Sequence, residues 1–138
     1  MRNYETFSTT ADTGIRIRGR TYRELYANAL RGLNLLLFGR NPRPARGRGE
    51  AVAFRFRGDG PENVLVNLLA RALDLAYGRG RGVAAATFSR AGAGAVAARL
   101  ILAAGARPPR LDIKAVTYHN LRVETRGGWL RAAIVFDI

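Results

Sequence analysis

The chain contains no cysteine, so it forms no disulfide framework and no thiolate metal site, and it has no cysteine nucleophile. It also lacks any apolar run near the ~18–20 residues that a bilayer span requires, and Met1 to Glu5 leads into polar residues, unlike a signal peptide. We therefore expect no membrane insertion and no cleaved leader, with the cytoplasm as the default location. The length of 138 residues predicts a single domain, residues 1–138, with one core.

Acidic residues are scarce: 10 aspartates and glutamates stand against 23 lysines and arginines, which gives a net charge of +13. Clustered basic side chains neutralise phosphates, so this charge indicates RNA as one class of partner. Only Lys114 of the basic residues is a lysine, and a general bias toward Arg, Ala and Gly explains the charge equally well. A functional RNA surface and a solvated basic surface are both open at this point.

Periodicity and capping signals predict alternating strands and helices in the first part of the chain. Thr21 and Glu24 have the spacing of a capping box, in which two side chains bond the free amide groups of a helix start. Pro61 suits the first position of a second helix because its missing N–H would be unpaired there. The predicted elements are a strand at 14–19, a helix from Thr21 to Gly39, a strand at 52–57 and a helix from Pro61 to Tyr77.

Two segments are rich in arginine and glycine. Residues Arg40–Gly49 mix proline, glycine and four arginines without any period, which predicts a basic loop. The run Gly78–Gly82 contains Arg79 and Arg81 and resembles RNA-binding tracts, but five residues of this kind are more often a turn that ends a helix. Arg79 and Arg81 are therefore candidate contacts to a protein or RNA partner, with a simple turn as the alternative.

The remaining chain is predicted to be strands. A hairpin is expected from 83–89 and 95–103, followed by a long strand from Leu111 to Glu124 and a final strand from Trp129 to Phe136. Strands around two helices predict the α+β class: one domain, with a mainly antiparallel sheet and both helices packed on one of its faces.

The only histidine, His119, lies within the predicted long strand. Alternation along that strand places His119 on the apolar face, which predicts a hydrogen-bonded histidine of the core rather than the base of a hydrolase. The sequence has no phosphate-binding glycine motif with its lysine and no paired histidine or cysteine ligands. Classical enzyme constellations are therefore not expected, and a hydrolase based on His119 is a minor alternative.

Two aspartates are candidate ligands because of where they fall. Asp12 comes just before the strand at 14–19, and Asp137 ends the apolar final strand, one residue before the α-carboxylate of Ile138. If the two segments were neighbours in the sheet, three carboxylates would converge, and an all-oxygen set suits Ca²⁺ or Mg²⁺ better than zinc. The alternatives are a turn or cap role for Asp12 and a solvated strand end for Asp137.

Four segments together resemble the archease family. They are Tyr4-Glu5-Thr6-Phe7, Thr10-Ala11-Asp12-Thr13-Gly14-Ile15, Lys114-Ala115-Val116-Thr117-Tyr118-His119 and the final Asp137-Ile138. The resemblance covers the chain from end to end. It implies a non-catalytic protein that assists an RtcB-type, GTP-dependent RNA-splicing ligase in tRNA splicing, by promoting guanylylation of the ligase and its turnover. It also implies a divalent cation, Ca²⁺ foremost and Mg²⁺ second, held by Asp12, Asp137 and the terminal carboxylate of Ile138.

The chain departs from the family pattern in two motifs and in its charge. Ser8-Thr9 stands where the family usually has Asp-His, and Ala70-Arg71 stands where it has Asn-Glu. Family members are typically acidic, whereas this chain is strongly basic. These differences predict a divergent member with altered metal binding or altered docking to the ligase.

Two further acidic residues and the basic segments complete the candidates. Asp59 and Glu62 begin the second predicted helix and would form an acidic contact surface for the ligase or RNA, or serve only as cap and dipole partner. The alternative function is a basic RNA-binding or RNA-chaperone module that needs no ligase and acts through Arg40–Arg57 and Arg79–Arg81.

Overall fold

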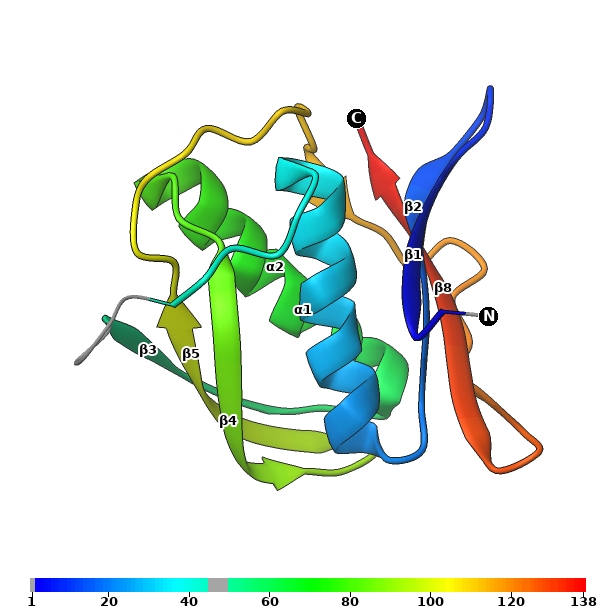
Figure 1. Cartoon of the computed structure of the whole chain (residues 1–138). Coiled ribbons are helices and arrows are strands. Elements are labelled where there is room, and N and C mark those ends of the chain that lie inside the picture. The colour runs from blue at the N-terminus through cyan, green and yellow to red at the C-terminus, as the bar shows by residue number, and fades with distance from the viewer. Residues whose placement is uncertain (1, 45–49) are drawn as a thin grey trace.

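A computed structural model describes residues 2–44 and 50–138, and in it two helices lie between two antiparallel sheets (Figure 1). The first sheet has the order β1-β2-β8-β6, with β7 also paired to β8. Its strands are β1 (Tyr4–Ser8), β2 (Thr13–Gly19), β6 (Ala115–Val116), β7 (Glu124–Arg126) and β8 (Trp129–Asp137). The second sheet has the order β3-β5-β4, from β3 (Ala51–Arg57), β4 (Val83–Ala91) and β5 (Ala95–Leu102).

Helix α1 (Tyr22–Phe38) begins and ends where its sequence signals predict. The Thr21 hydroxyl accepts a hydrogen bond from the Glu24 N–H at 3.1 Å, and the Glu24 carboxylate accepts one from the Arg20 N–H at 2.6 Å. Gly39 ends the helix in the left-handed conformation, with φ of 75°, which glycine adopts without a steric penalty. The predicted capping box and helix stop are confirmed.

Helix α2 (Pro61–Arg79) has proline in its first turn and ends at Gly80, which is also left-handed with φ of 65°. The Gly80 carbonyl accepts a hydrogen bond from the Arg107 N–H at 2.6 Å, so the turn is attached to the segment that follows β5. For the run Gly78–Gly82, the interpretation as a helix-ending turn is confirmed.

The core contains residues of both sheets and both helices. Ile15 and Ile17 of β2 and Leu100 and Leu102 of β5 are completely buried, and one apolar stripe of each helix lies between them. The Tyr26 hydroxyl in this core donates to the Gly92 carbonyl at 2.6 Å, and burial raises the pKa of the phenol. Both helices therefore contribute to one core that lies between the two sheets.

The α+β class is confirmed, and all the strand pairs are antiparallel, but the strands are divided between two sheets where the sequence predicts one. Period-two alternation predicts which face of a strand is buried and does not say which strand is its neighbour. The N-terminal strand β1 was not predicted from periodicity, because the apolar residues Tyr4 and Phe7 are three positions apart and do not follow a period of two.

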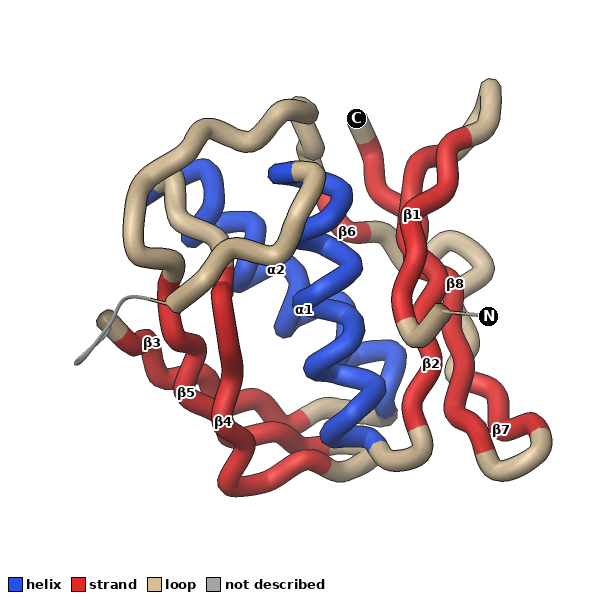
Figure 2. Tube along the Cα trace, viewed as in Figure 1, coloured by secondary structure: helices blue, strands red, loops and turns tan. Residues whose placement is uncertain are grey.

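The predicted long strand from Leu111 to Glu124 is wrong, because only Ala115–Val116 and Glu124–Arg126 pair with β8 (Figure 2). The Thr117 hydroxyl donates to the Val135 carbonyl at 2.8 Å and accepts from the His119 N–H at 3.2 Å, and Asn120 has a left-handed φ of 52°. These features turn the chain out of the sheet. His119 is therefore exposed in a turn, and its prediction as a core histidine is wrong.

Residues 45–49 of the predicted basic loop lie outside the described residues. In the parts of the chain that the structure does describe, no helix has the length and apolar character needed to cross a bilayer.

Candidate functional site

The candidate ligands Asp12 and Asp137 lie at the same end of two neighbouring strands. Strand β2 pairs with β8, and the last pair of their register is Thr13 with Phe136. Asp12 and Asp137 are the next residue on each strand at this end. Beyond them the β1–β2 turn and the C-terminus continue away from each other (Figure 1). The condition set by the sequence analysis, that the two segments be neighbours in the sheet, is met.

The turn before Asp12 is built by Thr9. The Thr9 hydroxyl accepts hydrogen bonds from the Asp12 N–H at 2.9 Å and the Ala11 N–H at 3.2 Å, and the Thr9 N–H donates to the Asp12 carbonyl at 2.8 Å. The side chain that shapes this turn is therefore that of Thr9. The Asp12 carboxylate is not needed for the turn, so the cap role considered for Asp12 is taken by Thr9.

The carboxylates of Asp12 and Asp137 take part in none of the hydrogen bonds and ion pairs found among the described residues. Asp12 is partly exposed and Asp137 is exposed. On the other side of Asp137, its carbonyl accepts a hydrogen bond from the Lys114 N–H at 2.7 Å. This end of the sheet therefore offers hard oxygen donors that are open to solvent, which is the donor chemistry that Ca²⁺ and Mg²⁺ prefer.

Side-chain ligands alone do not make a complete site here. Within residues 2–44 and 50–138, no three histidine, cysteine, aspartate or glutamate side chains are grouped closely enough to hold a metal ion. Two aspartates come to this end of the sheet, and Ile138 follows Asp137 directly and is 62% exposed. The α-carboxylate of Ile138 is a further oxygen donor at this end, beside the two aspartates.

Glu62 and Asp59 have different surroundings although both belong to the start of α2. The Glu62 carboxylate accepts a hydrogen bond from the Val123 N–H at 2.6 Å, so it holds the segment between β6 and β7. Asp59 is exposed, and its N–H donates to the Asn63 side chain at 3.3 Å. Asn63 in turn donates to the Tyr118 hydroxyl at 2.7 Å. A shallow hollow of about 360 Å³ lies among these residues and joins α2 to the Lys114–His119 motif.

Arg79 and Arg81 both form ion pairs with the same carboxylate. Both guanidinium groups form ion pairs with Glu50, that of Arg81 at 2.5 Å. The Arg81 side chain also donates to the Ala103 carbonyl, with its Nε at 3.0 Å. These contacts join the end of α2 to the start of β3 and the end of β5. Arg79 and Arg81 stay candidate partner contacts, but the structure already uses both side chains in internal contacts.

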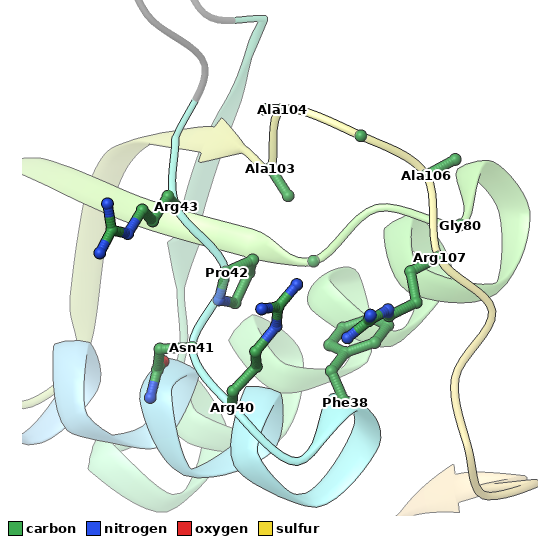
Figure 3. Close-up of a pocket in the computed structure, with 12 residues that line it drawn as sticks. Phe38, Arg40, Asn41, Pro42, Arg43, Gly80, Ala103, Ala104, Ala106 and Arg107 are labelled. Carbon is green, nitrogen blue, oxygen red and sulfur yellow. The ribbon is translucent and has the colours of Figure 1, made fainter.

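A basic hollow of about 620 Å³ lies beside this turn, lined by residues of three loops (Figure 3). Arg40 and Arg107 point into it from separate loops, whereas Arg43 points away. No hydrogen bond or ion pair of these three guanidinium groups is present among the described residues. Sequence reasoning missed Arg107, because nothing in the sequence indicates that the loop after β5 returns to the end of α1.

The second departure from the family pattern falls on the middle of α2. Ala70 and Arg71 are both partly buried, between the buried pairs Leu68-Leu69 and Ala72-Leu73. These two residues therefore lie at the partly buried edge of α2, outside the set of its buried residues.

The fold and the paired strand ends define a small α+β protein in which a layer of two helices lies between two sheets. A model of the Archease protein family (MTH1598/TM1083) matches residues 4–138. The chain is 31% identical to protein archease of Thermoplasma volcanium over 145 residues, covering 98% of each chain. It is 30% identical to protein archease of Thermoplasma acidophilum over 142 residues, covering 99% of this chain and 94% of that one. The chain belongs to the archease family.

Solved structures agree on the fold. The solution structure of Methanobacterium thermoautotrophicum protein 1598 superposes with a TM-score of 0.69 at 19% identity and covers 100% of both chains. The crystal structure of an archease from Thermotoga maritima, described as a possible chaperone, superposes with a TM-score of 0.60 at 24% identity and covers 96% of this chain and 94% of that one. At these identities the likeness establishes the fold alone.

Proposed function

We propose that this protein is a non-catalytic partner of an RtcB-type, GTP-dependent RNA-splicing ligase in the cytoplasm, and that it promotes guanylylation of the ligase and its turnover in tRNA splicing. Membership of the archease family supports the proposal, as does the family's Lys114–His119 motif, which includes β6 and ends in the exposed residues Tyr118 and His119. The single observation that carries it is the pairing of β2 with β8, which brings Asp12 and Asp137 to one end of the sheet.

The proposal includes a divalent cation, Ca²⁺ foremost and Mg²⁺ second, held by Asp12, Asp137 and the α-carboxylate of Ile138. The residues fit such an ion, because the side-chain donors are oxygens, are open to solvent and have no basic partner among the described residues. When bound, the cation would neutralise the carboxylates. Thr9 bonds the backbone at Asp12, and the Lys114 N–H bonds the carbonyl of Asp137, so the backbone is held at both aspartates.

Replacing Asp12 by asparagine is expected to weaken Ca²⁺ binding by roughly 100-fold or more, because the affinity of calcium sites depends strongly on the number of charged ligands. Isothermal titration calorimetry measures the affinity of the wild type and the variant. Asp74→Asn is the matched control. It also removes one exposed carboxylate, but Asp74 is in α2 and outside the proposed site. Equal affinity of the Asp12→Asn variant and the wild type would remove Asp12 from the site.

Multiple-turnover ligation tests the partner. With an RtcB-type ligase, GTP and exon halves in excess, adding this protein is expected to raise the amount of ligated RNA per ligase at least several-fold. Ligase guanylylation, measured with labelled GTP, should accelerate in parallel. If ligation and guanylylation are the same with and without the protein, the proposed partnership is wrong, while the fold and family stand.

A further inference from the structure

The outer face of the β3-β5-β4 sheet is open. Both helices pack on the other face of this sheet, and no helix or strand of residues 2–44 and 50–138 covers the outer one (Figures 1 and 2). Strand β5 shows the alternation: Val96, Ala98, Leu100 and Leu102 are buried, while Ala97 and Arg99 between them face outward. Every second residue of the three strands therefore projects from this outer face.

The charged residues at those outward positions are all arginines. Ala97 of β5 pairs with Arg55 on one side and Arg90 on the other, so two arginines flank one alanine in a single row of the sheet. Strands lie about 4.8 Å apart, so the backbones at Arg55 and Arg90 are about 10 Å apart across this row. A β-bulge at Phe88–Arg90 brings Arg90 into this position.

The adjoining rows add two more arginines. Arg99 pairs with Ala53 on one side and Thr87 on the other, and it is a diagonal neighbour of Arg55. Arg57 pairs with Ala95 and lies two residues along the same strand from Arg55. Arg55, Arg57, Arg90 and Arg99 are all exposed. We call these four residues the arginine face.

The arginine face has no compensating charge. No hydrogen bond or ion pair of its four guanidinium groups occurs in the described part of the chain, and no acidic residue stands on β4, β5 or β3 as the structure bounds them. Like charges ~8 Å apart repel by about 0.5 kcal/mol in water, and like-charged cross-strand neighbours destabilise a sheet. The fold thus gains nothing from this cluster, whereas a ligand of opposite charge would relieve it.

The shape of the face selects the kind of anion. A hollow of about 480 Å³ lies among Arg55, Arg57 and Arg90, and its other lining residues are Phe56, Ser89, Ala95, Val96 and Ala97. Long basic side chains around this hollow admit a phosphate from the solvent side. Protein interfaces depend on buried aromatic or aliphatic anchors, and the large exposed apolar residues of the described chain, Tyr77, Tyr118 and Ile138, all lie elsewhere.

We propose that the arginine face is a binding surface for the phosphate backbone of RNA. Each guanidinium neutralises a phosphate, so the affinity depends on charge and on salt and little on base sequence. This surface belongs to the second sheet, whereas Asp12 and Asp137 belong to the first, so RNA binding here does not require the cation site or the ligase partnership.

Fluorescence anisotropy with a labelled 20-nucleotide single-stranded RNA, from 50 to 300 mM NaCl, measures this. Replacing Arg55, Arg57, Arg90 and Arg99 together by glutamine should weaken binding on the order of 100-fold at 0.1 M salt and make the log–log salt slope less negative by about 2.8, since each phosphate contact contributes about −0.7. The control replaces four exposed arginines elsewhere, Arg2, Arg23, Arg122 and Arg126, by glutamine and removes the same charge. It should retain most of the affinity and of the slope.

Equal losses in the two glutamine variants would overturn the proposal, because the charge would then act diffusely. So would competition by poly-glutamate as strong as that of unlabelled RNA at equal charge. Replacing the four arginines by lysine keeps the charge and should keep the salt slope within about one unit. If the glutamine variant does not fold, backbone amide shifts of the wild type during RNA titration decide: changes at Ser89, Ala95 and Ala97 support the proposal, and changes confined to the Arg40–Arg107 hollow overturn it.

Discussion

Replacing Gly14 by alanine is expected to lower the free energy of unfolding by roughly 3 kcal/mol or more. A Cβ at this position would lie 2.1 Å from the carbonyl oxygen of Ile134 and 2.6 Å from the ring of Phe7. The first contact is with the backbone of β8, the neighbouring strand, so no side-chain rotation relieves it. Urea unfolding followed by the fluorescence of the single tryptophan, Trp129, measures the loss.

Gly105→Ala is the matched control for this prediction. Its added Cβ would meet nothing within 4 Å in the exposed loop after β5, so stability should stay within about 0.5 kcal/mol of the wild type. The Gly14 variant should also bind Ca²⁺ more weakly than the control, because the strain falls two residues from Asp12. A Gly14→Ala protein as stable as the wild type would show that β1, β2 and β8 do not approach each other as described.

Replacing Leu100 by alanine is expected to cost 2–5 kcal/mol of unfolding free energy, the range for large-to-small changes at fully buried leucines. Leu100 is 0% exposed in the central strand of the second sheet, and it pairs with Val52 and Ala86 on its two sides. The methyl groups that are removed face the helices, and a paired central strand cannot move to fill the space. Chemical unfolding with an unchanged m-value would give this cost directly.

Arg99→Ala, one residue away on the same strand, is the control for Leu100→Ala. Arg99 faces outward and has no ion pair among the described residues, so its loss should change stability by less than about 0.5 kcal/mol or raise it slightly. Comparable losses for the two variants would mean that the inner and outer faces of β5 are assigned wrongly. The same Arg99 variant should weaken RNA binding. The inner face of the sheet would then contribute to stability and the outer face to RNA binding.

Local sequence signals were sufficient for the helices. Thr21 and Glu24, Gly39, Pro61 and Gly80 act within a few residues of their own positions, so capping and left-handed ends could be predicted without a partner. The hairpin of β4 and β5 was likewise predicted from its two apolar segments and the turn between them, whereas the alternation of burial along β5 came from the structure. The prediction of a strand from Leu111 to Glu124 was wrong, because a tertiary contact, from the Thr117 hydroxyl to the Val135 carbonyl, overrides the local apolar period.

The candidate cation site was predicted from the sequence only in part. Asp12 and Asp137 could be selected from the sequence, since a carboxylate beside a strand end is visible there, but their proximity required the pairing of β2 with β8, which are over 100 residues apart in the chain. Thr9 illustrates a missed role: as a departure from the family pattern it was expected to change metal binding, and the structure also makes it the residue that shapes the turn.

The sequence by itself determined the class of fold, the helix limits and the family, because these depend on local propensity, on periodicity and on motifs a few residues long. Only the tertiary structure decided the division into two sheets, the exposure of His119, the pairing of Arg79 and Arg81 with Glu50, and the gathering of four arginines on one open face. Those features depend on which strands are neighbours, and neighbour choice is set by the packing of two helices that each bury apolar surface on more than one side.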